Sequence, residues 1–461
     1  MESDTQERQR RINMAVLACL TVIFVLAVML QWYSGDRGTA IMGNIVFPLV
    51  CAGIGIVFAR GAFAKYGELR LAAAFVLWYA VTRMIHRDHY LGAVRADLAL
   101  LAGCCCLVLA HPYVMDAQTR RRVSRFVMDT LLVFTVAISW LAVYAAVTGN
   151  AVRLPLAQSD IGVDKAYRRL MIFGWHANTG GSILSVCAVM ALYRHQMVRH
   201  KVPSAILTGF ALLGYFCAVT LSDSRAAIIN LAFFLSVALV ILLSRRVSLK
   251  SRVLKGAALV LLAAVLCGSL YVANGLVRTS ITAFSEQMAA KSSQDAQEPQ
   301  ATQIAGRNLL KDASTLNGRT GIYRAAIRTL ARDPVRLLTG GDEAVLIAQV
   351  NRQLKIPVDH THNSFLQITA AMGLPGLAIV IAFLVLLILR GVRLFIAPSA
   401  ASADRIALLI PVMIVIHGMV EPLVFYCFNL INVLFFLFSG IIFLRSREVA
   451  PARGMRPGAS A

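Results

Sequence analysis

Residues 374–391 read Leu-Pro-Gly-Leu-Ala-Ile-Val-Ile-Ala-Phe-Leu-Val-Leu-Leu-Ile-Leu-Arg-Gly, and only Arg390, close to the end, carries a charge. About 20 apolar residues are enough to cross the ~30 Å hydrocarbon core of a bilayer. A helix is the expected form, because it satisfies its own backbone hydrogen bonds where no water is present. The stretch therefore predicts a membrane-spanning helix.

The composition of the whole chain agrees with this prediction. The 461 residues are 58% hydrophobic and 15% charged, with a mean hydropathy of +0.70. Soluble domains carry about 25% charged residues, so a soluble globular protein is excluded. Similar apolar runs recur and predict twelve spans, at residues 12–33, 39–59, 71–86, 94–115, 124–148, 172–193, 203–221, 225–244, 254–274, 374–391, 405–425 and 429–445. We expect an all-α polytopic membrane protein with about twelve transmembrane helices.

The distribution of basic residues predicts the orientation of the spans. The formal net charge is +22, and most of the surplus lies in alternate connections, from Arg8, Arg10 and Arg11 to Arg445 and Arg447. Cytoplasmic loops of membrane proteins are enriched in Lys and Arg. The pattern predicts that both termini are cytoplasmic, and it explains the positive charge without a nucleic-acid partner.

Four regions follow from this arrangement. Residues 1–274 hold spans one to nine, and residues 275–362 form one large outer loop with short helices. Residues 363–447 hold a re-entrant or interfacial helix and spans ten to twelve, and residues 448–461 are a cytoplasmic tail. Within the outer loop, residues 286–303 are rich in Gln, Ser, Ala and Lys, which is typical of a flexible segment.

The sequence that leads into residues 374–391 is His360-Thr361-His362-Asn363-Ser364-Phe365-Leu366-Gln367. We expect a short helix from Asn363 to Met372, broken by Gly373-Leu374-Pro375-Gly376 before the tenth span. Its N-terminus would hold the histidines at the outer surface and offer N–H groups to an anion. An imidazole in that place can act as a general base at neutral pH. The alternative is that the histidines are helix caps or interfacial anchors.

Arginines gather on the same predicted side of the membrane. Arg225 lies in a short outer turn, where it either pairs with Asp223 or binds phosphate. Arg319 lies at a predicted helix start, and Arg153 and Arg169 lie in the loop between spans five and six. Guanidinium groups bind phosphate oxygens through paired hydrogen bonds. The cluster therefore indicates recognition of a phosphorylated, lipid-borne substrate.

Arginines beside an imidazole indicate a particular reaction. A lipid diphosphate would be held by its phosphates while its bond to a sugar breaks, and the histidine would deprotonate the incoming sugar hydroxyl. The chain has no H-E-x-x-H, P-loop, Asp-rich or paired C-x-x-C motif, so we expect no metal and no cofactor. A lipid or solute transporter is the alternative from a different class. It is less favoured, because the charges lie at the outer ends of the spans and not near the midplane.

Three motifs, taken in order, resemble the bacterial O-antigen ligase family. They are Ser222-Asp223-Ser224-Arg225, then Asn317-Gly318-Arg319 followed by Gly340-Gly341, and then the His360–Gln367 motif. The wider superfamily includes O-antigen polymerases and protein O-oligosaccharyltransferases. Through the twelve-helix layout and the large outer loop, the resemblance covers most of the chain.

The resemblance implies a metal-independent, inverting glycosyltransferase of the bacterial inner membrane, with its active site facing the periplasm. Such an enzyme transfers O-antigen polysaccharide from undecaprenyl diphosphate to the lipid A core oligosaccharide. His362 is then the general base, and Arg225 and Arg319 hold the donor diphosphate. Four further residues are expected to support the site or position a substrate: His360, Asn363, Arg153 and Arg169. The alternatives within the superfamily, a polymerase or a protein O-oligosaccharyltransferase, use the same donor.

Overall fold

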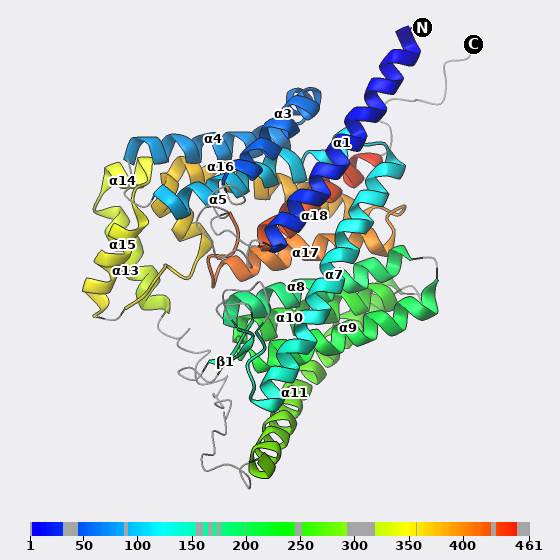
Figure 1. The fold of residues 1–461 in the computed structure, drawn as a ribbon, viewed down its shortest axis with the longest axis vertical. Helices are drawn as coiled ribbons and strands as arrows, with labels where there is room; N and C mark the ends of the chain where they lie inside the picture. Colours follow the sequence, from blue (N-terminus) through cyan, green and yellow to red (C-terminus); the bar gives the residue numbers. More distant parts are fainter. Residues whose placement is uncertain are drawn as a thin grey trace.

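Helices make up nearly all of the described chain (Figure 1). The computed structural model describes residues 2–30, 45–86, 91–153, 160–164, 169–172, 177–198, 200–244, 251–292, 319–355, 357–425 and 430–449. The helices are α1 (Glu2–Leu30), α3 (Phe47–Lys65), α4 (Gly67–His86), α5 (Leu91–Gly103), η3 (Cys104–Val108), α6 (His111–Val114), α7 (Ala117–Thr148), α8 (Ala177–Met197), α9 (Lys201–Leu221), α10 (Arg225–Leu243), α11 (Arg252–Ser292), α13 (Arg319–Ala331), α14 (Pro334–Thr339), α15 (Glu343–Leu354), α16 (Ser364–Ile396), α17 (Ser402–Gly418) and α18 (Leu430–Glu448). In the described residues, a small antiparallel hairpin joins β1 (Gly162–Asp164) to β2 (Arg169–Met171).

Nine segments of the described chain are helical, long and apolar enough to cross a membrane. They are α1, α3, the α5–α6 segment, α7, α9, α10, α11, α16 and α18. The three other predicted spans also fall on helices, namely α4, α8 and α17. Helix α17 ends at Gly418, so residues 419–425 of the predicted eleventh span lie beyond it. The expectation of an all-α polytopic membrane protein is confirmed, and the number of twelve spans stays a prediction.

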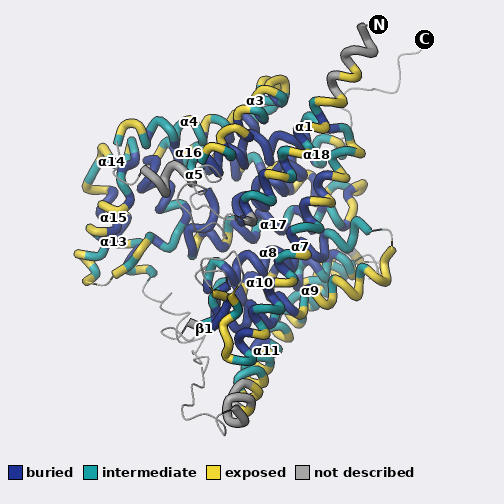
Figure 2. The backbone as a smooth tube through the Cα atoms, in the orientation of Figure 1, coloured by how far each residue is buried: buried dark blue, intermediate teal, exposed yellow. Residues whose placement is uncertain are grey.

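Buried residues lie along the inner faces of the helices (Figure 2). An aromatic group joins α16 to α18, where the ring centroid of Phe383 is 6.0 Å from that of Phe436 and 5.5 Å from that of Phe443. Phe425 packs on the same group, 4.9 Å from Phe435. Because lipid chains are as apolar as these side chains, close packing holds the helices together more than escape from water does.

Ion pairs link helix ends on the side predicted to be cytoplasmic. Arg447, at the end of α18, donates to Glu68 at the start of α4 over 2.8 Å. Arg445 donates to Asp404 at the start of α17 over 3.0 Å. These contacts bring the ends of three helices together, and the other end of α4 lies beside α14 on the opposite side of the molecule (Figure 1).

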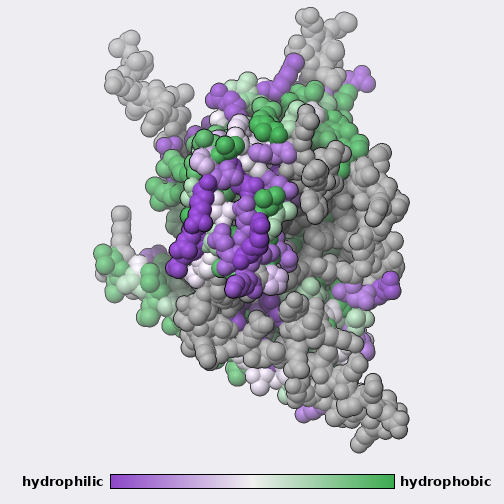
Figure 3. Space-filling model, turned by 90° about the vertical axis from the view of Figure 1, so that its left-hand side faces the viewer, coloured by the Kyte–Doolittle hydropathy of each residue, from purple (hydrophilic) through white to green (hydrophobic). Residues whose placement is uncertain are grey.

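Three short helices of the outer loop, α13 to α15, lie together at one side of the molecule (Figure 1). Ile322, Ala326 and Leu330 of α13 form a buried cluster with Leu346 and Val350 of α15. The three α13 residues therefore face the interior of this helical unit. Figure 3 views this side, where hydrophilic side chains gather.

The outer loop begins with helical turns that continue α11. This helix runs from Arg252 to Ser292, well past the predicted end of the ninth span at residue 274. The prediction of a flexible segment is wrong for residues 286–292, and the rest of that segment lies outside the described residues. The physical reason is composition, because Glu, Gln, Met, Ala and Lys in this part have high helix propensity and extend an apolar helix that already exists.

Helix α16 is broken at Gly373, as predicted. This residue has a φ of 67°, in the left-handed region that glycine adopts without a steric cost. A Cβ on Gly373 would lie 2.4 Å from the carbonyl oxygen of Leu338, and a Cβ on Gly340 would lie 2.2 Å from that of Ala371. The backbones of α14 and α16 are therefore in direct contact, and this contact fixes the position of the outer part of α16.

The break interrupts the hydrogen-bond ladder of α16, and α4 supplies a donor at that point. The indole Nε1 of Trp78 donates to the carbonyl oxygen of Met372 over 2.7 Å. A buried backbone group without a partner costs free energy comparable to a lost hydrogen bond, and Met372 is buried. The bond from Trp78 therefore stabilises the broken helix.

We expect Gly373→Ala to lower the stability of the protein by at least ~2 kcal/mol, because it adds a left-handed non-glycine residue and a steric clash. The measurement is thermal unfolding of the purified protein in detergent. Gly321→Ala is the matched control, because a Cβ there meets only Leu354 at 3.7 Å. Equal unfolding temperatures for the two variants would contradict the argument.

Candidate active site

The loop before α16 holds both histidines in a defined backbone conformation. Asn363 caps α16, and its side-chain oxygen accepts from the N–H groups of Phe365 at 2.9 Å and Leu366 at 3.0 Å. His362 has a φ of 53°, and its carbonyl oxygen accepts from the hydroxyl of Tyr323 in α13 over 2.9 Å. Because Asn363 already uses two of the free N–H groups, this helix start offers fewer donors to an anion than predicted.

The carboxylate of Glu343, at the start of α15, holds the same loop from the side of the α13–α15 unit. Gln367 accepts from Thr361 through its Oε1, at 2.8 Å from the hydroxyl, and donates through Nε2 to Glu343 over 3.1 Å. Arg83 of α4 donates to the other oxygen of Glu343 over 2.7 Å. Burial raises the pKa of Glu343 to about 7, although Arg83 and Gln367 act to lower it. This chain of contacts fixes Thr361, which lies between the two histidines.

Glu421, just beyond the end of α17, is the residue on which the polar side chains converge. One carboxylate oxygen, Oε1, accepts from Arg319 Nη2 over 2.5 Å and from Asn178 Nδ2 over 2.5 Å. The other, Oε2, lies 3.3 Å from Nδ1 of His362. The Glu421 side chain is only 5% exposed, whereas those of Arg319 and His362 are 15% and 23% exposed. Glu421 therefore lies beneath the site, and its two ionisable partners reach the surface.

The charge state of Glu421 follows from these partners. Burial alone would raise the pKa of Glu421, but the hydrogen bond with His362 and the charges of Arg319 and His362 lower it to about 2. The group is therefore an anion at neutral pH. A carboxylate only accepts hydrogen bonds, so its bond to His362 requires the ring proton on Nδ1 and leaves Nε2 with its lone pair in the neutral ring.

Asn178 and Arg169 connect this cluster to the outer turn between α9 and α10. Arg169 donates through Nη2 to the Asn178 side-chain oxygen over 2.8 Å and to the carbonyl oxygen of Asp223 over 3.0 Å. Its Nε donates to the carbonyl oxygen of Ser222 over 3.0 Å. The guanidinium of Arg169 thus stabilises the turn before Arg225 and connects this turn to the cluster around Glu421.

A buried polar network lies one layer further from the surface. His417 of α17 is held between Ser182 of α8, 2.6 Å from its Nε2, and Asn230 of α10, which donates to its Nδ1 over 2.8 Å. Ser182 also donates to the backbone oxygen of Asn178 over 2.5 Å. These bonds fix α8, α10 and α17 against one another below Glu421.

The structure brings most of the predicted site residues together. Arg319, His362, His360 and Asn363 lie at one place, where the rings of His360 and His362 have centroids 4.1 Å apart. Arg169 reaches them through Asn178. The role predicted for each of them stays a prediction.

Arg153 and Arg225 stand apart from that group in different ways. Arg153 is exposed, beside the backbone bridge between Val152 and Ile161, and the described contacts do not join it to the cluster. Arg225 begins α10, directly after the braced turn. The carboxylate of Asp223, considered above as a partner of Arg225, accepts from Arg278 of α11 over 2.9 Å.

Glu421 was not predicted from the sequence as a site residue. Glu421 fell inside the predicted eleventh span, in the apolar surroundings of Met419, Val420 and Leu423. A charged residue in such surroundings is costly, and that cost alone marks it as a functional candidate with a partner. The partner itself lies 102 positions away in sequence, at Arg319, so spacing could not identify it.

Three groups in the described residues could in principle bind a metal ion together. The candidate ligand atoms of His360, His362 and Glu421 lie within 4.8 Å of one another. Both oxygens of Glu421 already have partners in Arg319, Asn178 and His362. A cation between Glu421 and His362 would replace the proton on Nδ1 and would lie close to the positive charge of Arg319, which disfavours it.

The fold and the site define a polytopic α-helical membrane protein in which arginine, glutamate and histidine side chains meet at one end of the helices. The family model described as O-antigen ligase matches residues 209–381, which include Arg225, Arg319 and the two histidines of the loop before α16. The match confirms the resemblance to the O-antigen ligase family over these residues. A search of curated proteins finds no match to the chain. Glu421 and Asn178 lie outside the matched residues.

Proposed function

We propose that this protein transfers an O-antigen polysaccharide from undecaprenyl diphosphate to the core oligosaccharide of lipid A, at the periplasmic face of the bacterial inner membrane. The family match supports a glycosyltransferase of the O-antigen ligase or polymerase type. The choice of the ligase, of this donor and of this acceptor is the proposal. Its main support is the contact of one buried carboxylate, Glu421, with both Arg319 and His362.

In the proposed reaction, His362 is the general base. Glu421 accepts a hydrogen bond from Nδ1–H, so that Nε2 has the lone pair that takes the proton of an acceptor hydroxyl. The acceptor oxygen then attacks the anomeric carbon of the donor sugar from the side opposite the diphosphate. The new carbon–oxygen bond forms as the bond to the diphosphate breaks, and undecaprenyl diphosphate leaves as an anion. The attack inverts the anomeric configuration.

The leaving diphosphate needs cations, and the proposal assigns that role to Arg319 and Arg225. A guanidinium has five N–H groups, and the hydrogen bond to Glu421 uses a group on one nitrogen of Arg319. Its remaining N–H groups are suited to phosphate oxygens. Arg225 follows the turn braced by Arg169, which places a second guanidinium at the start of α10. His360 and Asn363 position the loop that carries the base.

The decisive experiment examines lipopolysaccharide in a strain that lacks this protein. We expect bare lipid A core and polymer accumulating on its lipid carrier, restored to normal by the wild-type chain and not by His362→Ala, because loss of a general base costs about 10²–10⁴-fold in rate. Membrane levels of the variant should equal those of the wild type, and His360→Ala should retain measurable transfer. Core bearing a single repeat would identify a polymerase instead, and normal lipopolysaccharide would refute both.

Glu421→Gln tests the assignment of Glu421 as a positioning residue. The amide can donate to Nδ1 of His362, which favours the tautomer with a protonated Nε2 and removes the base. We expect kcat to fall by about 10²–10³-fold with little change in the KM for the donor, measured with purified donor and acceptor. Glu421→Asp keeps an acceptor-only group and should recover part of the rate. An effect confined to donor KM or to folded yield would contradict this role.

Arg319→Ala should act on donor binding. Loss of a charge-assisted hydrogen bond costs about 1.5–3 kcal/mol, so we expect the Kd for undecaprenyl diphosphate to rise by roughly 10–100-fold. Arg324→Ala is the matched control, because Arg324 is exposed on the same helix. Unchanged binding by the Arg319 variant, or equal weakening by both variants, would refute a diphosphate role for this arginine.

A further inference from the structure

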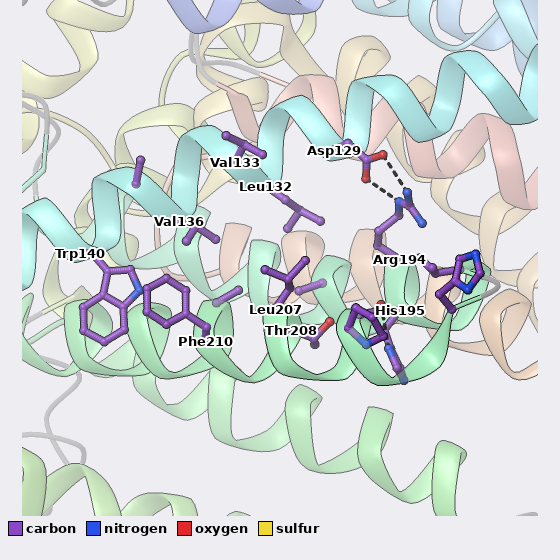
Figure 4. Close-up of a pocket in the computed structure, with 17 residues that line it drawn as sticks. Asp129, Leu132, Val133, Val136, Trp140, Arg194, His195, Leu207, Thr208 and Phe210 are labelled. Carbon is purple, nitrogen blue, oxygen red and sulfur yellow. Dashed lines mark hydrogen bonds and ion pairs between the residues drawn. The ribbon is translucent and has the colours of Figure 1, made fainter.

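A groove lies between α7, α8 and α9 (Figure 4), and none of the residues that line it belongs to the candidate active site. Its volume is about 760 Å³. Val133 of α7 and Leu207 of α9 face it and are 71% and 68% exposed. Side chains with such exposure on transmembrane helices face lipid, so the groove opens toward the hydrocarbon of the bilayer.

The two ends of the groove differ in chemistry (Figure 4). At one end, the rings of Trp140 and Phe210 stack with centroids 4.8 Å apart and planes 20° apart. At the other end, the guanidinium of Arg194 donates to both oxygens of Asp129, over 2.5 and 2.7 Å. His195 lies at the same end. The groove therefore has apolar walls, an aromatic end at Trp140 and Phe210, and a charged end at Arg194 and Asp129, which we call the charged rim.

The length of the groove matches one leaflet of a bilayer. Asp129 and Trp140 are about three turns apart on α7, which is a rise of about 16 Å. Half of a hydrocarbon core of ~30 Å is about 15 Å. An acyl chain that starts at the charged rim would thus end at the stacked rings, near the middle of the membrane.

A second cation beside the charged rim gives this end of the groove a net positive charge. Among the residues that line the groove, Arg194 and Asp129 carry opposite charges, and Lys201 lies next to the lining residue His200. Lys201 donates to the backbone oxygens of His195 and Gln196 over 3.1 and 3.0 Å, which holds its ammonium group beside the rim. An anionic headgroup complements this end better than a zwitterionic one does.

The rim lies far from the candidate active site. Asn178, at the start of α8, contacts Glu421, and Arg194 is at the end of the same helix. The rise between these two residues is about 24 Å. The groove is therefore separate from the diphosphate site, and the rim lies in the leaflet predicted to be cytoplasmic.

We propose that this groove binds an anionic phospholipid, with one acyl chain between Val133 and Leu207 and its phosphate at Arg194 and Lys201. The lipid would fill the gap between α7 and α9 and brace the helix that carries Asn178. This inference does not depend on the proposed enzymatic function.

The test uses the full-length protein, stripped of lipid in detergent and titrated with dioleoyl phosphatidylglycerol or dioleoyl phosphatidylcholine while native mass spectrometry counts bound lipid. We expect phosphatidylglycerol to bind at least tenfold more tightly, and Leu207→Trp to weaken it at least tenfold by filling the groove. Ile206→Trp is the matched control, because Ile206 is 69% exposed on the same helix but does not line the groove. It should bind as the wild type does.

Two further variants test the two ends of the proposed lipid, its acyl chain and its headgroup. Val133→Trp fills the groove from α7 and should reproduce the loss if Leu207→Trp fails to fold. Lys201→Gln should reduce the preference for phosphatidylglycerol and leave binding of phosphatidylcholine unchanged. Equal binding of the two lipids, equal effects of the two α9 variants, or stronger Leu207-dependent binding of undecaprenyl phosphate would overturn the proposal.

Discussion

The buried carboxylate of Glu421 is the constraint on which the site depends. An ionised carboxylate removed from water is stable only if donors satisfy its oxygens. Here the donors come from three separate parts of the chain, namely Arg319 at the start of α13, Asn178 at the start of α8, and His362 in the loop before α16. Because each donor satisfies the same anion, these segments must meet at one place. The free-energy cost of removing this carboxylate from water is therefore offset only when α8, α13 and the loop before α16 pack together.

The catalytic candidate His362 lies between two acidic anchors. Glu421 contacts its ring directly, and Glu343 acts through Gln367 on the neighbouring Thr361. The first anchor belongs to the helical bundle, and the second belongs to the α13–α15 unit. A side chain held from two structural units in this way keeps its orientation only while the units stay docked, which couples the outer loop to the chemistry of the membrane-embedded part.

The sequence was sufficient for features that depend on local physics. Apolar runs located the helices, Gly373 marked the break, and Asn363 marked the helix start, because each signal lies within a few residues of its effect. The pairing of Asp223 with Arg278 and of Glu421 with Arg319 could not be predicted, since these partners meet only after distant helices pack. The length of α11 was not predicted either, although its cause is local. The residues that follow the apolar run have high helix propensity, so the helix continues beyond the predicted end of the span.

The break at Gly373 divides α16 into two parts that are held in place by different contacts. The turns before it are held by the backbone contact with α14 and by the hydrogen bond from Trp78 to Met372. The turns after it are held by packing inside the bundle. A residue inserted into a continuous helix rotates everything beyond it by about 100°, but such an insertion after the break would leave the histidine loop where its own contacts place it. The position of the reactive groups is thus independent of the helical register of the transmembrane part of α16.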